Sequence, residues 1–168
     1  MHSRASRRMV WFCLLSAALL PLSMPSGAQV KSTPDRIAKM VSLMKADNYN
    51  YQTTNSNAVW VIHFTGDHLK DIKVVLAASD SPDVDFVCFV TVVPKARLPV
   101  TTDFMRMLLE QNHNIDRAKI AYDKDGDLSI ETEDSLRAID AQELRSIISH
   151  IRDNADFIYG KVEPYLLP

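Results

Sequence analysis

Apolar positions recur with a helical period in the first part of the chain and again near its middle. Ser32-Thr33-Pro34-Asp35 combines a hydroxyl cap, a proline and an acidic residue, which is a typical helix start. The stripe that follows consists of Ile37, Met40, Val41 and Met44. Thr101-Thr102-Asp103 marks a second start, and the apolar residues after it are Phe104, Met105, Leu108 and Leu109. We therefore predict two amphipathic helices, the first of which ends near Asp47-Asn48.

A third and longer helix is predicted near the end of the chain. It begins after Asp140-Ala141-Gln142-Glu143, which resembles a capping box with Ile139 and Leu144 placed as a hydrophobic staple. Its apolar stripe keeps helical spacing for about five turns. The stripe consists of Leu144, Ile147, Ile148, Ile151, Ala155, Ile158 and Val162.

Strand-like runs fill the two intervals between these helices. The first interval holds four runs, at 49–53, 59–64, 72–78 and 84–93. Their short connections, one of them Asn55-Ser56-Asn57, predict an antiparallel meander. We expect its two apolar-rich strands to lie centrally, covered at least partly on both faces. The second interval alternates with period two around Ala118–Tyr122 and again from Leu128 to Glu133.

The predicted order is α-β-β-β-β-α-β-β-α. Such an order favours an α+β fold in which helices pack on one face of an antiparallel sheet. No repeat or linker divides the chain after its N-terminal segment, so residues 29–168 are expected to form a single domain.

The stretch AYDKDGDLSIETED, from Ala121 to Asp134, is rich in acidic residues. An EF-hand loop with Gly126 at its sixth position would place Ala121 first and Thr132 last, and neither supplies a carboxylate. Asp125-Gly126 instead suits a tight hairpin turn. Leu128 and Ile130 would then point inward. Glu131 and Glu133 would point to solvent on an outer strand, where like charges discourage edge pairing. Weak divalent-ion binding by Asp123, Asp125 and Asp127 remains the alternative.

The first 28 residues predict a secretory signal peptide. Arginines precede an apolar run from Met9 to Leu20, and small residues follow at Ser26-Gly27-Ala28. The run is shorter than the roughly 20 residues that span a bilayer, although an uncleaved anchor stays open. Cleavage would leave a periplasmic or secreted protein with 16 basic and 21 acidic residues, a formal charge of −5. This balance argues against binding to nucleic acid or anionic membranes.

Only Cys88 remains after such cleavage, within the apolar run VDFVCFVTVV. The run favours a buried thiol, with a nucleophile or an intermolecular disulfide as alternatives. The histidines lack zinc-binding spacing, and no G-x-S-x-G elbow is present. The composition therefore indicates no metal or cofactor.

Two segments resemble a known family. LLEQNHNIDRAKIAYDKDGDLSIETED and the later ADFIYGKVEPYL are similar to the YbjN-like family, which is described as bacterial sensory transduction regulators. The matching features are Leu108-Leu109 with Asn112, the strand at 118–120, the Asp-Gly turn into Leu128, and Ala155-Asp156 with Tyr159. The resemblance implies a fold like that of type III secretion chaperones, and no catalytic residues or cofactor. The export signal and the lack of a proline after Ile130 depart from the family.

Together these features predict a non-enzymatic, exported binding, adaptor or regulator-like module. The sheet or the second helix would engage a protein partner, or a second copy in a homodimer. Phe104, Met105, Leu108 and Leu109 are the candidate anchors on that helix, unless all four belong to the core. The alternatives are a small periplasmic enzyme that uses Cys88 or an assembled acid pair, and a ligand-binding sensor domain.

Overall fold

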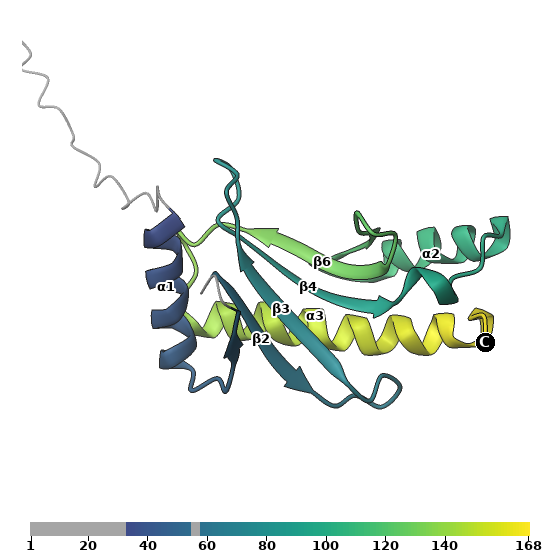
Figure 1. Cartoon of the computed structure of the whole chain (residues 1–168), viewed down its shortest axis with the longest axis horizontal. Helices are drawn as coiled ribbons and strands as arrows, with labels where there is room; N and C mark the ends of the chain where they lie inside the picture. Colours follow the sequence, from purple (N-terminus) through teal and green to yellow (C-terminus); the bar gives the residue numbers. More distant parts are fainter. Residues whose placement is uncertain (1–32, 55–57) are drawn as a thin grey trace, which may run out of the picture.

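The structure, a computed structural model, describes residues 33–54 and 58–168. Its elements are α1 (Thr33–Ala46), β1 (Gln52–Thr53), β2 (Val59–Phe64), β3 (Ile72–Ala78), β4 (Phe86–Val93), η1 (Lys95–Arg97), α2 (Thr102–Asn114), β5 (Lys119–Tyr122), β6 (Leu128–Asp134), α3 (Ala141–Val162) and η2 (Glu163–Tyr165). The predicted order and the α+β class are confirmed (Figure 1). No helix within the described ranges has the length and apolar character needed to cross a membrane. The predicted signal peptide, the Ser32 cap and the 55–57 turn lie outside these ranges.

The strands form one antiparallel sheet in the order β1-β2-β3-β4-β6-β5. β2 and β3 have the predicted bounds. The fourth run was predicted to start at residue 84, but β4 starts at Phe86 because Asp85 is drawn into a buried ion pair described below. The first strand is shorter than predicted and contains only Gln52–Thr53.

Helix α3 covers one face of the sheet and runs behind the strands in Figure 1. The strand side chains that point to it are fully buried, among them Trp60, Leu76 and Cys88. They pack with the predicted apolar stripe of α3, whose members are all buried. Asp140 caps the helix by accepting a hydrogen bond from the backbone N–H of Glu143 at 2.8 Å. The predicted stripe of α3 therefore supplies much of the hydrophobic core.

The opposite face of the sheet differs from the sequence expectation. It carries a block of half-buried apolar side chains that are not packed against the main core: Val59, Val61, Val75, Ala77, Val87 and Phe89. We call this block the open sheet face. The apolar-rich strands β3 and β4 are central, as predicted, but within the described residues helices cover only one of their faces. The expectation that both faces are covered is therefore wrong for this part of the chain.

The acidic strand β6 also lies elsewhere than predicted. It pairs with β4 on one side and with β5 on the other, so it is an interior strand and not an outer one. Leu128 and Ile130 point into the core as expected. Glu131 and Glu133 lie on the other face, where both form ion pairs with Lys119 of edge strand β5. Their charges therefore stabilise the pairing of β5 with β6 and do not serve to discourage pairing at an exposed edge.

A buried ion pair joins α1 to the sheet. Arg36 and Asp85 are each 5% exposed, and Arg36 Nε lies 2.9 Å from Asp85 Oδ1. The guanidinium also donates to the carbonyl oxygens of Ser79 and Ser81. The other oxygen of Asp85 accepts hydrogen bonds from Ser135 Oγ and from the N–H of Leu136, both at 2.8 Å. The pair therefore links α1, the β3–β4 loop and the β6–α3 loop.

A second polar contact fastens α3 to the β2–β3 loop. The carboxylate of Asp156 accepts hydrogen bonds from the backbone N–H groups of residues 67, 68 and 69, at 3.1, 2.9 and 2.7 Å. A side chain at Gly66 would place its Cβ 2.1 Å from Asp156 Oδ1, so this approach requires glycine. Burial opposes ionisation of Asp156, but the three backbone hydrogen bonds outweigh it and lower the pKa of the carboxyl group.

Arg36→Ala should destabilise the protein by about 3–5 kcal/mol, because it leaves the Asp85 carboxylate buried without its counter-charge. Urea denaturation followed by circular dichroism measures this loss. Arg117→Ala is the matched control, since it breaks a more exposed ion pair with Glu143 and should cost at most about 1 kcal/mol. Equal losses for the two variants would contradict the assignment.

Asp156→Asn should lower the free energy of unfolding at neutral pH by about 1–3 kcal/mol, because a neutral amide accepts the three backbone hydrogen bonds less strongly. The folded-state pKa of Asp156 is depressed, so its contribution is present above the unfolded pKa of about 3.9. It is lost as the pH falls through the folded pKa. Urea titrations at several pH values should show wild type and variant converging in acid. Asp153→Asn, at an exposed carboxylate of the same helix, should change little.

Candidate functional site

The four candidate anchors of α2 divide between two environments. Phe104 and Leu108 are 0% and 5% exposed and belong to the core, and the Phe104 ring lies 5.9 Å from that of Tyr165. Met105 and Leu109 are 42% and 72% exposed. The structure therefore corrects the candidate set, because Phe104 and Leu108 are not accessible to a partner. A surface role for Met105 and Leu109 stays a prediction.

Local sequence explains this division. The Thr101 side chain accepts a hydrogen bond from the backbone N–H of Phe104 at 3.3 Å and fixes where the helix begins. Successive helical residues differ by about 100° in direction. Because Phe104 and Leu108 point inward, Met105 and Leu109, which follow them, must point toward the rim of the buried stripe.

Two shallow hollows flank the outward side of α2, with volumes of about 190 and 250 Å³. Met105 and Tyr122 line both, and the Tyr122 hydroxyl lies 3.4 Å from Met105 Sδ. Leu109 lines the first hollow and Val100, which is 99% exposed, lines the second. We call Val100, Met105, Leu109 and Tyr122 the α2–β5 surface. Partial burial raises the pKa of the Tyr122 hydroxyl, so it remains a neutral hydrogen-bonding group.

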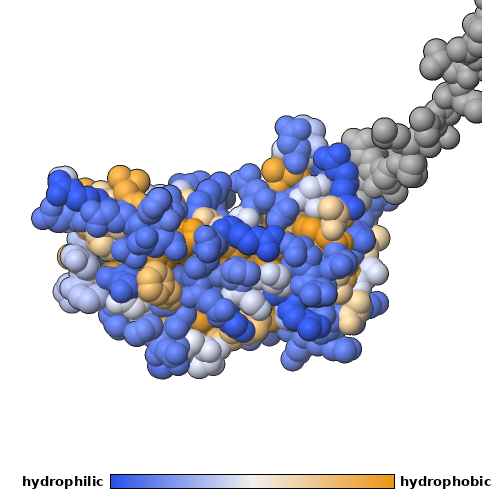
Figure 2. All heavy atoms as spheres, turned by 180° about the vertical axis from the view of Figure 1, so that it is seen from behind, coloured by the Kyte–Doolittle hydropathy of each residue, from blue (hydrophilic) through white to orange (hydrophobic). Residues whose placement is uncertain are grey.

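Exposed apolar side chains are concentrated at this end of the molecule. Within the described residues, seven large hydrophobic side chains are exposed, and four of them form the α2–β5 surface. Tyr165 and Leu167 lie at the same end, since the Tyr165 ring packs near Phe104 of α2 and the N–H of Leu167 donates to the carbonyl of Arg97 in η1. Figure 2 shows hydrophobic residues at the end that carries α2, and others elsewhere on this mostly hydrophilic side. Such a concentration marks an interaction site more often than a random surface does.

One outward-facing donor on the edge strand β5 is already occupied by a side chain of α2. The side-chain oxygen of Asn112 accepts a hydrogen bond from the backbone N–H of Ile120 at 2.9 Å. A donor that an added strand would need is therefore already used. A partner at the α2–β5 surface would bind by inserting side chains into the hollows, not by extending the sheet.

The acidic hairpin uses its aspartates for its own backbone. Asp123 Oδ1 accepts hydrogen bonds from the N–H groups of Asp125 and Asp127, both at 2.9 Å, and Gly126 adopts a positive φ of 86°. Asp127 Oδ1 accepts a hydrogen bond from the N–H of Lys95 at 2.7 Å. Within the described part of the chain, no group of three or more histidine, cysteine, aspartate or glutamate residues is arranged to hold a metal ion. Weak ion binding at this turn gains no support from the geometry.

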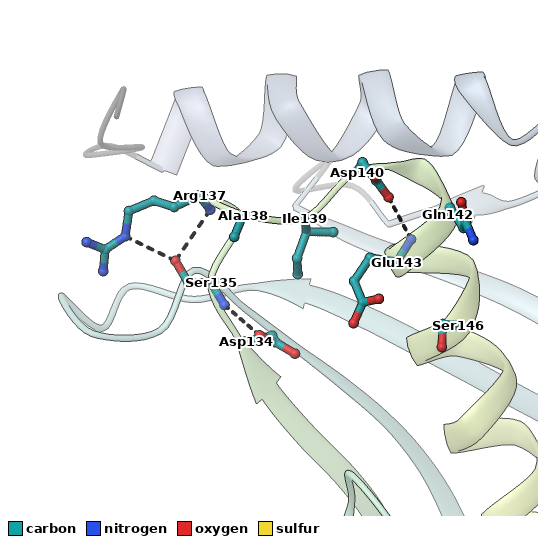
Figure 3. A pocket seen from close by; sticks show the side chains of 9 residues that line it. All are labelled: Asp134, Ser135, Arg137, Ala138, Ile139, Asp140, Gln142, Glu143 and Ser146. Atoms are coloured by element: carbon teal, nitrogen blue, oxygen red, sulfur yellow. Dashed lines mark hydrogen bonds between the residues drawn. The ribbon is translucent and has the colours of Figure 1, made fainter. Parts of the chain in front are cut away.

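The enzymatic alternatives find little support. Cys88 is fully buried in a central strand, and desolvation raises the pKa of its thiol. A hollow of about 800 Å³ lies around the β6–α3 loop (Figure 3). Each carboxylate that lines it already has a partner: Asp134 bonds the N–H of Ser135, Asp140 caps α3, and Glu143 pairs with Arg117. No acid pair poised for general acid–base chemistry is assembled there.

Sequence reasoning missed Val100 and Tyr122 as parts of the α2–β5 surface. Val100 stands alone between Pro99 and the Thr101 cap, so no periodicity assigns it a side. Tyr122 has the same strand parity as the partly buried Ile120, and the alternation would place it inside. Its exposure follows from its place at the end of an edge strand, which only the sheet order reveals.

Comparisons with known proteins add a structural likeness. No protein-family model matches the sequence, and no curated protein gives a significant match. Among solved structures, the chain is similar to the Yersinia pestis type III secretion chaperone SycH, solved in complex with a stable fragment of YscM2. The TM-score is 0.47 and the sequence identity 15%, over 71% of this chain and 96% of that chain.

A likeness of this size carries no argument about function. The α+β fold therefore rests on the elements described above, and membership of the YbjN-like family stays a prediction.

Native Cys88 should resist a thiol reagent such as Ellman's reagent and react fully after denaturation in guanidinium chloride, because its burial keeps the thiol protonated and out of reach. Absorbance of the released thiolate measures both states. Val100→Cys, at a fully exposed position, is the positive control for the native state. Rapid labelling of Cys88 in the folded protein would reopen the nucleophile alternative.

Proposed function

We propose that this protein is a non-enzymatic, exported binding module, an adaptor or regulator, that engages a protein partner through the α2–β5 surface. The observation that carries this proposal is the pair of apolar hollows separated by Met105 and Tyr122, with exposed Leu109 and Val100 at their outer ends. Export rests on the predicted signal peptide at 1–28, and the regulator role on the resemblance to the YbjN-like family.

The chemistry of the surface favours a protein over a small polar ligand. Its two hollows are shallow and lined mostly by aliphatic and aromatic side chains. Protein interfaces are enriched in methionine and tyrosine, and methionine adapts to partners of different shape. A partner that contributes two apolar side chains, one for each hollow, would bury the exposed surface of Leu109 and Val100. A second copy of the chain is the other candidate occupant of this surface.

Leu109→Asp and Met105→Asp should each abolish capture of the partner when tagged protein is used to pull down proteins from the envelope fraction of the cell that makes it. A charge placed in an apolar interface must be desolvated without a counter-charge, which costs several kcal/mol. Quantitative mass spectrometry compares the variants with wild type, and light scattering reports the oligomeric state.

Phe157→Asp is the matched control. Phe157 is 43% exposed on α3, nearly the same as Met105, but it does not line either hollow. It should leave capture unchanged. If Leu109→Asp alters neither the captured proteins nor the oligomeric state, the α2–β5 surface is not the binding site.

A further inference from the structure

The open sheet face is a second apolar surface, distinct from the α2–β5 surface. Its side chains come from three neighbouring strands: Val59 and Val61 from β2, Val75 and Ala77 from β3, and Val87 and Phe89 from β4. The strand register places them in two rows, Val61–Val75–Phe89 and Val59–Ala77–Val87. The six residues are half-buried but are not packed on the main core.

Strands that carry apolar side chains on both faces are typical of sheets covered on both faces. Here the described residues supply a helical cover for one face only. The uncovered block is about 10 Å wide across three strands and about 7 Å long between the two rows, so it is nearly square. A nearly square block can be covered by the same block turned through 90°.

Two borders of the block carry polar or charged side chains. The border on β6 runs along the strand direction and consists of Glu131 and Glu133, next to Lys119 of β5. The other border runs across the strands and consists of His63 on β2 and its register partner Lys73 on β3. Asp71 lies beyond this second border and contacts both of its members, at 3.3 Å each.

These borders are complementary when two sheets cross at a right angle. In that arrangement a border that runs along the strands of one copy overlies a border that runs across the strands of the other. Glu131 and Glu133 then face His63 and Lys73 of a second copy, and Lys119 lies toward its Asp71. A two-fold axis repeats the same contacts on the other side. An aligned arrangement of the sheets would not bring the two borders together.

We propose that the open sheet face packs against the same face of a second copy, with the strands of the two sheets crossing at about 90°. The block and its borders span about five strands and three positions along each strand, or roughly 500 Å² per copy. A stable interface buries about 800 Å² per partner. The self-association is therefore weak and depends on concentration, in the micromolar range or above. It is independent of the α2–β5 surface.

Sedimentation velocity of the protein purified after export, over a range of concentrations, tests this proposal. Wild type should shift reversibly from monomer to dimer, and Phe89→Glu should stay monomeric throughout the same range. Circular dichroism establishes that the variant is folded. Leu109→Asp should dimerise like wild type, which separates this surface from the one that holds the protein partner. A wild type that stays monomeric at every concentration would overturn the proposal.

A charge exchange tests the crossing angle and avoids changes in packing, because Lys73 and Glu133 are both exposed. Lys73→Glu and Glu133→Lys should each weaken self-association at least 5-fold, an estimate based on the strength of close charge pairs. The double variant, which restores opposite charges across the interface, should recover most of the loss. Additive weakening in the double variant would exclude the right-angle arrangement.

The Val75→Cys variant tests whether something other than a second copy covers the open sheet face. In the dimer, its reaction with a thiol reagent should slow as the protein concentration rises. If the protein is monomeric and this cysteine is still protected, another segment of the same chain covers the face, and the proposal is wrong.

Discussion

The buried ion pair between Arg36 and Asp85 is the constraint on which the arrangement of the other elements depends. Two charges removed from water are costly unless every hydrogen-bonding group around them is satisfied. Here the guanidinium bonds the β3–β4 loop, and the carboxylate bonds the β6–α3 loop. The pair therefore sets where α1 lies, where β4 begins, and how the chain leaves β6 before α3. Apolar packing alone would allow α1 to slide, whereas the ion pair and its loop hydrogen bonds favour one position for the helix.

The two faces of the sheet result from this arrangement. Asp85 holds α1 at one end of the strands, and Asp156 holds α3 along the face that contains Trp60, Leu76 and Cys88. These contacts, together with the packing of Phe104 against Tyr165, hold all three helices on the packed side of the sheet. No described helix is left for the opposite face. The molecule thus has a rigid, fully packed side and two apolar surfaces that are accessible in the described residues.

Much of the fold could be predicted from local patterns, and the failures have physical causes. Caps and periodicity gave the starts of α2 and α3, and β2 and β3 match their predicted bounds because turn-forming residues delimit both runs in the sequence. The start of β4 was missed because an aspartate in an apolar run gives no sign that it will be buried with an arginine 49 positions earlier. The interior place of β6 was missed because strand order is set by long-range pairing. The candidate anchors on α2 were grouped correctly by helix, but periodicity could not say which of two adjacent positions faces the core.

The hydrogen bond from Ile120 to Asn112 also bears on how the chain folds. Its two partners are only eight residues apart, so the bond can form as soon as α2 and β5 meet, without waiting for contacts distant in the sequence. The docking of α3 against β3 and β4 joins segments much farther apart, so we expect it to follow. We therefore expect one donor of the edge strand to be occupied while the rest of the sheet is still incomplete. A chain in this intermediate state would offer one less free edge to its neighbours, at the stage when proteins are most prone to aggregate.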